Sequence, residues 1–184
     1  MQQHERDAMR HLSVAAFGGD PHIARLIDAL GASWAWDDAL SFVAEQGGSL
    51  VGQALYTHAL LDAPGELVDV LVLSPLSVLP DRQGRGVGTA LLAAAIERGR
   101  ALGAPALFLE GSPTYYAARG FARGSAHGFL PPTDRVPDPA FQVVVYDAHE
   151  DWMTGRLVYR DVWWEHDSTG LRDPDLAEVE ARFT

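Results

Sequence analysis

Apolar residues near the start of the chain recur at helical spacing in two successive segments. Residues 9–17 place apolar side chains on one face and predict a first helix. A second predicted helix begins with Asp20 as the N-cap and Pro21 in the first turn, and it ends at Gly31. The chain therefore opens with two short amphipathic helices.

Longer apolar runs follow and predict strands. Residues 41–45 and 50–60 flank a turn with two glycines and are expected to pair as an antiparallel hairpin. Residues 67–78 are almost continuously apolar, as in a strand that is buried on both faces. Pro75 lies inside this run and has no amide hydrogen to donate, so we predict a bulge or a local break in pairing there.

The next segments predict a βαβ unit. A glycine-rich connection at residues 80–88 leads into a helix over 87–102, and a short apolar strand follows at 106–110. The two strands of such a unit are parallel and joined by a right-handed crossover. One or two helical turns are predicted at residues 114–119, and a proline-rich loop at 124–140. Two strands follow at 141–146 and 155–159, and residues 175–183 are either a short helix or a frayed tail.

Composition narrows the class of protein. The chain has 184 residues, of which 47% are hydrophobic, so we predict one α/β domain over residues 1–184, with a core at 7–164 and a tail at 165–184. The net charge of −11 repels phosphate backbones and argues against nucleic-acid binding. The chain has no cysteine, which excludes disulfides and thiolate chemistry. Because no apolar run approaches the ~20 residues of a membrane span and the first ten residues do not resemble a secretory signal, we expect a cytoplasmic protein without membrane contact.

The glycine-rich connection is the most informative segment. Three glycines alternate at positions 84, 86 and 88 between a buried strand and the start of a helix. Glycine lets the backbone turn sharply and present consecutive amides, and these amides together with the positive end of the helix favour a phosphate or diphosphate. The segment has no Gly-Lys-Ser/Thr, and its Gly-x-Gly-x-Gly spacing differs from the dinucleotide fingerprint.

Two motifs resemble the GNAT superfamily of N-acetyltransferases. Val-Leu-Pro at residues 78–80 followed by Gln-Gly-Arg-Gly-Val-Gly at 83–88 is similar to the family's coenzyme A motif, Gln/Arg-x-x-Gly-x-Gly/Ala. Tyr-Ala-Ala-Arg-Gly-Phe at 116–121 is similar to its Tyr-x-x-x-Gly-Phe, and Pro-Thr-Tyr-Tyr at 113–116 resembles a bacterial subgroup of predicted acetyltransferases. The order of elements agrees from about residue 7 to 164. The family's first strand is expected to be missing here, because residues 1–10 are polar.

The resemblance implies a fold, a cosubstrate and its contacts. The fold is a mixed central sheet flanked by helices, whose fourth and fifth strands splay to admit the pantetheine arm, and Pro75 would help to hold the splay. The cosubstrate is acetyl-CoA, without a metal. The resemblance implies cofactor contacts from the end of the strand, the loop and the short helix, at Leu76, Ser77, Val78, Gln83, Gly84, Arg85, Gly86, Val87, Gly88, Thr89 and Tyr116.

The resemblance also suggests how an acetyl group moves to an amine. It assigns protonation of the leaving thiolate to Tyr116, with Tyr115 as the neighbouring alternative, and stabilisation of the thioester oxygen to the amide of Val78. Glu110 lies where open α/β sheets place their sites, and burial there would raise its pKa, so we consider it as the base. Asp69, His127 and ordered water are rivals for that role, and Tyr116 could instead only contribute packing.

Three functions stay open from the sequence. The first is an N-acetyltransferase acting on a small-molecule or protein amine, for which the acidic balance favours a cationic acceptor and which is compatible with a homodimer. The second is a catalytically inactive acyl-CoA-binding or sensor module of the same fold. The third is a nucleotide-phosphate enzyme that uses the same loop. The seven histidines show no metal-ligand spacing, and no Gly-x-Ser-x-Gly motif of a serine hydrolase occurs.

Overall fold

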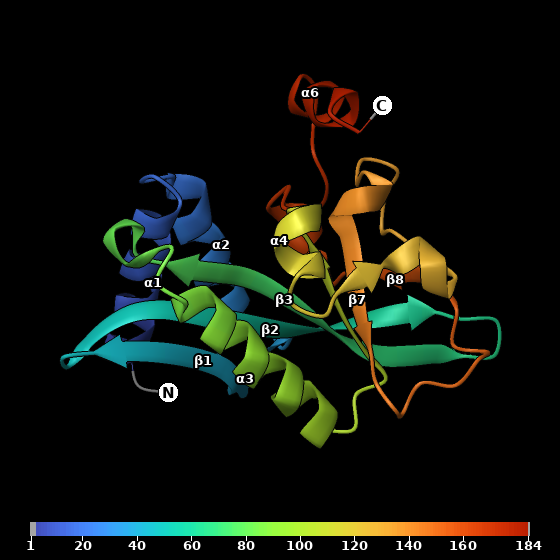
Figure 1. Ribbon diagram of the computed structural model, residues 1–184, viewed down its shortest axis with the longest axis horizontal. Helices are drawn as coiled ribbons and strands as arrows, with labels where there is room; N and C mark the ends of the chain where they lie inside the picture. Colours follow the sequence, from blue (N-terminus) through green and yellow to red (C-terminus); the bar gives the residue numbers. More distant parts are fainter. Residues whose placement is uncertain (1–2, 184) are drawn as a thin grey trace. The chain divides into compact units, whose positions relative to one another are not determined.

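The computed structural model describes the backbone of residues 3–183 and all of their side chains except those of residues 3, 4, 37 and 38 (Figure 1). Contacts divide the chain into two compact units. The first unit comprises residues 1–57 and 73–98, and the second comprises residues 58–72 and 99–184. Both units are therefore assembled from segments that are distant in sequence.

The first unit begins with α1 (Gln3–Ala16) and α2 (Pro21–Ala32). Asp20 caps α2 as predicted, because its carboxylate accepts a hydrogen bond from the amide of His22 at 2.8 Å. The predicted apolar face of α1 is buried at Met9 and Leu12, whereas Phe17 lies beyond the helix and is 45% exposed. The described residues begin with α1, so the expected loss of the family's first strand stays a prediction.

A hairpin and a helix complete the first unit. The strand β1 (Trp36–Gln46) pairs antiparallel with β2 (Ser49–Asp62), as predicted, although β1 starts five residues earlier than its apolar run. The helix α3 (Val87–Ala101) packs closely on β2, since a Cβ at Gly52 would lie only 2.9 Å from a methyl carbon of Val87. Glycine at position 52 thus allows the glycine-rich connection to enter α3 directly against the sheet.

The strand β3 (Leu67–Val78) matches the predicted bounds and contributes to both units. It pairs in parallel with β4 (Ala106–Glu110) through Leu71 with Leu107 and Val72 with Phe108, which confirms the predicted parallel pair. The strand continues through a cis Ser74–Pro75 peptide bond, and the predicted bulge or local break in pairing at Pro75 stays a prediction. The β3–β4 pairs lie before Pro75 in the chain.

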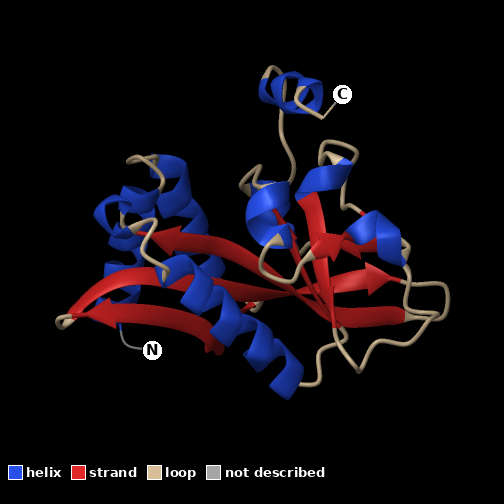
Figure 2. Ribbon diagram, viewed as in Figure 1, coloured by secondary structure: helices blue, strands red, loops and turns tan. Residues whose placement is uncertain are grey.

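In the second unit, further strands pair with β4 and with the end of β2 (Figure 2). β4 pairs antiparallel with β7 (Phe141–Val145), which pairs antiparallel with β5 (Ala122–Arg123). The end of β2 pairs antiparallel with β8 (Gly155–Val158), which pairs in parallel with β6 (Phe129–Leu130). Parallel and antiparallel pairs occur together, so the prediction of a mixed α/β fold is confirmed.

Aromatic rings form the centre of this second unit. Phe108 of β4 lies with its ring centroid 4.9 Å from that of Phe129 and 5.5 Å from that of Phe141, and all three are fully buried. Such contacts join β4, β6 and β7 into one rigid core. The end of β4, where Glu110 lies, is thereby held in place.

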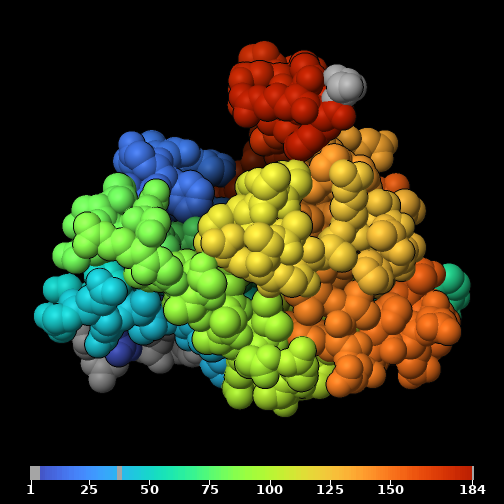
Figure 3. Space-filling model, viewed as in Figure 1, coloured from blue at the N-terminus to red at the C-terminus, as the bar shows by residue number. Residues whose placement is uncertain are grey.

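Short helices follow the strands of the second unit. These are α4 (Pro113–Ala117), α5 (Asp161–Glu165) and α6 (Asp175–Ala181). The sequence predicted α4 and did not predict α5. For residues 175–183 it predicted either a short helix or a frayed tail, and α6 is that helix. Figure 3 shows α6 as a protruding group of atoms near the C-terminus. No helix in the described part of the chain is long and apolar enough to cross a membrane.

Candidate active site

The glycine-rich connection forms an open turn in the first unit. Gly84 and Gly86 adopt positive φ angles of 69° and 86°, a region that other residues enter only at a cost. A Cβ at either position would meet no atom within 4 Å, so space is not what requires glycine there. The backbone conformation itself requires it, as the sequence predicted.

The amides of this turn have no backbone carbonyl partner in the part of the chain that the structure describes. Within the described residues, the backbone amides of Gly84, Arg85, Gly86, Val87 and Gly88 donate to no backbone carbonyl. The first backbone bond of the helix runs from the amide of Ala90 to the carbonyl of Gly86, at 2.9 Å. Consecutive unused amides at a helix N-terminus form an anion site, since they point outward and lie at the positive end of the helix dipole.

Side chains of the same turn hold it and add charge. Gln83 donates from Nε2 to the carbonyl oxygen of Val78 at 3.0 Å, which ties the turn to the end of β3. Arg85 and Thr89 are exposed, whereas Val87 is buried and anchors α3. Arg85 thus adds a solvent-facing positive charge to the anion site.

The last residues of β3 divide between two faces. Ser77 is buried, and its Oγ lies 2.8 Å from Oγ of Ser13 in α1, so its side chain points into the core of the first unit. Leu76 and Val78 are half-buried on the opposite face. The amide of Leu79 donates to Val51 of β2 at 3.0 Å, so the preceding amide, that of Val78, points to the other edge of β3. The amide of Val78 therefore has the direction that a donor to an oxyanion at that edge of β3 needs.

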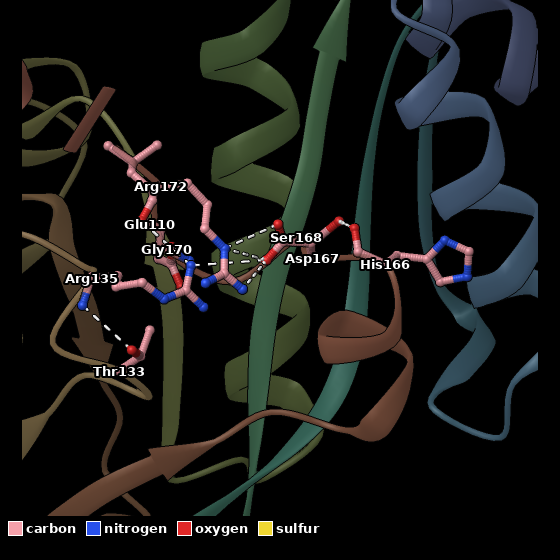
Figure 4. Close-up of polar contacts among 9 residues, drawn as sticks. Glu110, Thr133, Arg135, His166, Asp167, Ser168, Gly170 and Arg172 are labelled. Carbon is pink, nitrogen blue, oxygen red and sulfur yellow. Dashed lines mark hydrogen bonds and ion pairs between the residues drawn. The ribbon is translucent and has the colours of Figure 1, made fainter. Parts of the chain in front are cut away.

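Glu110 ends β4 in the second unit, and its carboxylate is largely buried (Figure 4). Its Oε2 accepts a hydrogen bond from the amide of Gly170 at 3.0 Å, and the side chain of Tyr159 lies near the carboxylate. Its Oε1 is buried and has no hydrogen-bond partner in the described structure. Burial raises the pKa of Glu110, while Tyr159, Gly170 and Arg135 act in the opposite direction. The predicted direction of the pKa shift is confirmed.

Tyr116 lies on α4 in the second unit. Its ring covers Gly111, where a Cβ would overlap it, and its centroid lies 5.7 Å from that of Phe121. Burial raises the pKa of Tyr116 to about 12, so the hydroxyl is protonated at neutral pH. A protonated phenol is the form that an acid requires.

The alternatives to these two residues are engaged elsewhere in the second unit. The guanidinium of Arg119 lies 3.7 Å from the ring centroid of Tyr115. The carboxylate of Asp69 is 2.7 Å from His58 and 3.6 Å from Arg160, and its side chain is 58% exposed. His127 is exposed in a 3₁₀ turn. We therefore retain Glu110 and Tyr116 as the candidate base and acid.

The contact between Glu110 and the C-terminal segment was not predicted from the sequence. Residues 165–184 were predicted to be a tail, yet Thr169 is fully buried and Gly170 bonds to Glu110. Gly170 has φ 65°, and a Cβ there would lie 2.9 Å from the carbonyl oxygen of Arg135. A glycine in a polar tail carries no signal of such a long-range contact, so only the structure reveals it.

A cavity of about 500 Å³ adjoins this segment within the second unit. Its walls combine Glu110 and Arg135 with apolar side chains from the proline-rich loop and the C-terminal segment, among them Val136, Pro137, Leu171 and Phe183. Pockets of this size accommodate small molecules. Among the residues that the structure describes, no group of three or more histidines, aspartates or glutamates is placed to hold a metal ion.

Comparison with known proteins identifies the family. The model of the acetyltransferase (GNAT) family matches residues 6–129. The uncharacterized N-acetyltransferase YjhQ of Escherichia coli strain K12 is 34% identical over 113 residues, which are 61% of this chain and 62% of the relative. The chain thus aligns with less than two thirds of that relative.

Two solved structures share the fold over most of the chain. The GNAT family N-acetyltransferase YhbS from Escherichia coli, in complex with CoA, superposes with a TM-score of 0.76 at 22% identity and covers 89% of this chain and 88% of its own. A GNAT family acetyltransferase from Brucella melitensis, in complex with acetyl-CoA, gives a TM-score of 0.69 at 26% identity and covers 89% and 94%. The chain belongs to the GNAT family of acetyltransferases.

Proposed function

We propose that this protein transfers the acetyl group of acetyl-CoA directly to a primary amine. The observation that carries the proposal is the run of five amides, Gly84 to Gly88, that donate to no backbone carbonyl in the described chain. A diphosphate satisfies several such donors at once. The relatives crystallised with CoA and with acetyl-CoA support coenzyme A as the source of that diphosphate.

The cofactor contacts of the proposal lie at the end of β3 and in the turn after it. The edge of β3 at Leu76 to Val78 pairs with the amides of the pantetheine arm as an added strand would. The turn holds the diphosphate through its amides, and Arg85 adds a positive charge. Ser77 contributes only its backbone, because its side chain is bonded to Ser13 in the core.

The reaction requires one proton to leave the amine and another to reach the thiolate. Glu110 accepts the proton of the ammonium, and the neutral amine attacks the thioester carbonyl. The amide of Val78 stabilises the negative charge on the carbonyl oxygen. The C–S bond then breaks, Tyr116 donates its proton to the departing sulfur, and the nitrogen returns a proton to the phenolate through solvent. The products are an amide and free coenzyme A, and one proton is released overall.

Thiol release from acetyl-CoA in the presence of a panel of amines tests this function. We expect acceptor-dependent release of coenzyme A together with an acetylated product of the corresponding mass. The proposal fails if acetyl-CoA binds but no amine accelerates thiol release, since that result describes a binding or sensor module. A preference for ATP over coenzyme A in a thermal-shift assay would also contradict it.

A further inference from the structure

The cavity beside Glu110 contains charges of both signs. Oε1 of Glu110 is buried without a hydrogen-bond partner in the described structure. Glu110 also lines the cavity, so a donor bound there lies beside a carboxylate that is incompletely hydrogen-bonded. An ammonium group supplies both the donor and the compensating charge.

Two arginines line the same cavity, and one of them, Arg182, is in an ion pair on its own helix. Nη1 of the other, Arg135, lies 3.4 Å from the carbonyl oxygen of Leu171 and 3.9 Å from the carboxylate of Asp167. Asp167 is already bound closely by Arg172, with contacts of 2.8 to 3.1 Å. The guanidinium of Arg135, whose side chain is 22% exposed, therefore has only long contacts to these acceptors and retains donors for an anion.

One short segment bonds to both Glu110 and Arg135. Residues 169–171 bond to Glu110 through the amide of Gly170 and to Arg135 through the amide of Leu171, at 3.0 and 2.9 Å. Figure 4 shows Glu110, Gly170 and Arg135 in one cluster. This segment therefore fixes the carboxylate of Glu110 relative to the backbone of Arg135.

A simple cationic amine is a poor match for this arrangement. It would satisfy Glu110, but Arg135 would repel it in a partly buried site. A ligand with an ammonium and a carboxylate satisfies both groups, and an apolar body between or beside them contacts Val136, Pro137 and Leu171. The cavity is thus complementary to a zwitterion.

We infer that this cavity binds the acceptor and that the acceptor is an amino acid with an apolar body, its ammonium beside the carboxylate of Glu110 and its carboxylate at Arg135. The inference rests on the proposed acetyl transfer and adds the class of substrate. Arg135 binds and positions the substrate and takes no part in proton transfer.

Matched acceptors test the role of the carboxylate. L-Leucine is compared with 3-methylbutylamine, and 4-aminobutanoate with propylamine, so that each pair differs only by the carboxylate. We expect at least a tenfold higher kcat/KM for the acid member of at least one pair, measured by thiol release from acetyl-CoA. Equal or higher kcat/KM for both simple amines overturns the inference and leaves the proposed acetyl transfer intact.

Variants at Arg135 test its assignment. Arg135→Gln is expected to remove the preference for the amino acid over the simple amine, and Arg135→Lys is expected to retain part of that preference. Arg123→Gln is the matched control, because Arg123 is exposed and lies 3.6 Å from Asp138. A structural defect would lower the rates for both members of a pair equally, and that result would overturn the assignment.

Calorimetry decides the case in which no acceptor of the panel releases thiol. Binding of L-leucine or 4-aminobutanoate, with loss of that binding in Arg135→Gln, would support the inference even though acetyl transfer had failed. Absence of binding by both amino acids would overturn it. Failure of the proposed function and failure of this inference are thereby distinguished.

Discussion

Tyr116 carries the clearest prediction at the scale of single residues. Replacement by phenylalanine removes the proton donor but keeps the ring that covers Gly111 and contacts Phe121. We expect kcat for thiol release to fall about 10²-fold with little change in the Kd of acetyl-CoA. Tyr115→Phe is the control, since its ring lies beneath Arg119. Unchanged kcat in Tyr116→Phe would show that this residue only contributes packing.

Glu110 predicts a dependence on pH. Because burial raises its pKa above the ordinary 4.5, the base is deprotonated only above that raised value. We expect kcat to rise with pH through the raised pKa, and this limb should be absent in Glu110→Gln. An identical pH profile in the variant would contradict the assignment of Glu110 as the base.

The same shift affects stability. The folded state favours the protonated carboxyl, so the contribution of Glu110 is fully present below its unfolded pKa and is lost as the pH rises through its folded pKa. The free energy of unfolding of the wild type, relative to that of Glu110→Gln, should therefore decrease as the pH rises through this range. Denaturant unfolding at several pH values measures the difference, and a difference that increases with pH would contradict the account.

Single residues also show where sequence reasoning reached its limit. The direction of the Glu110 pKa shift followed from its position at the end of a buried strand. The contacts of Glu110 with Gly170 and Tyr159 did not, because both partners lie about 50 or more positions away in the chain and neither belongs to a motif. Arg135, in a proline-rich loop, had no sequence signal for the same reason.

At the scale of elements, the turn between β3 and α3 can be tested through its backbone. Gly86 and Gly103 both have positive φ, and at neither position would an added Cβ meet an atom within 4 Å. Substitution by alanine should therefore cost each variant about 1–2 kcal/mol of unfolding free energy. Only Gly86→Ala should also weaken acetyl-CoA binding, by about tenfold or more, because only that turn presents amides to the diphosphate.

Denaturant unfolding and calorimetry on the two variants separate these effects. Gly103→Ala controls for loss of stability, since Gly103 follows the far end of α3. Equal affinity of both variants for acetyl-CoA would remove the turn from the proposed binding site.

Elements with strong local patterns were predicted well. The bounds of β3 and β4 and the start of α3 agree with the apolar runs and the glycine turn. The two-residue strands β5 and β6 were missed, because they exist only through pairing with β7 and β8. The five-residue helix α5 is too short for helical periodicity to appear.

For the whole molecule, the division into two compact units separates the proposed roles. The turn that offers its amides belongs to the first unit, whereas Glu110, Tyr116 and Arg135 belong to the second. Strands β2 and β3 contribute residues to both. The net charge of −11 opposes the approach of anionic acetyl-CoA, so affinity for it must come from the local amides and Arg85 rather than from the overall field.

Titration calorimetry with acetyl-CoA and with S-acetylpantetheine tests the central claim most directly, because the two ligands share the thioester arm and only acetyl-CoA carries the diphosphate. If the amides of Gly84 to Gly88 bind that diphosphate, acetyl-CoA should bind at least about 100-fold more tightly, a difference of about 2.7 kcal/mol. Equal affinity for the two ligands, or no binding of acetyl-CoA at millimolar concentration, would contradict the account.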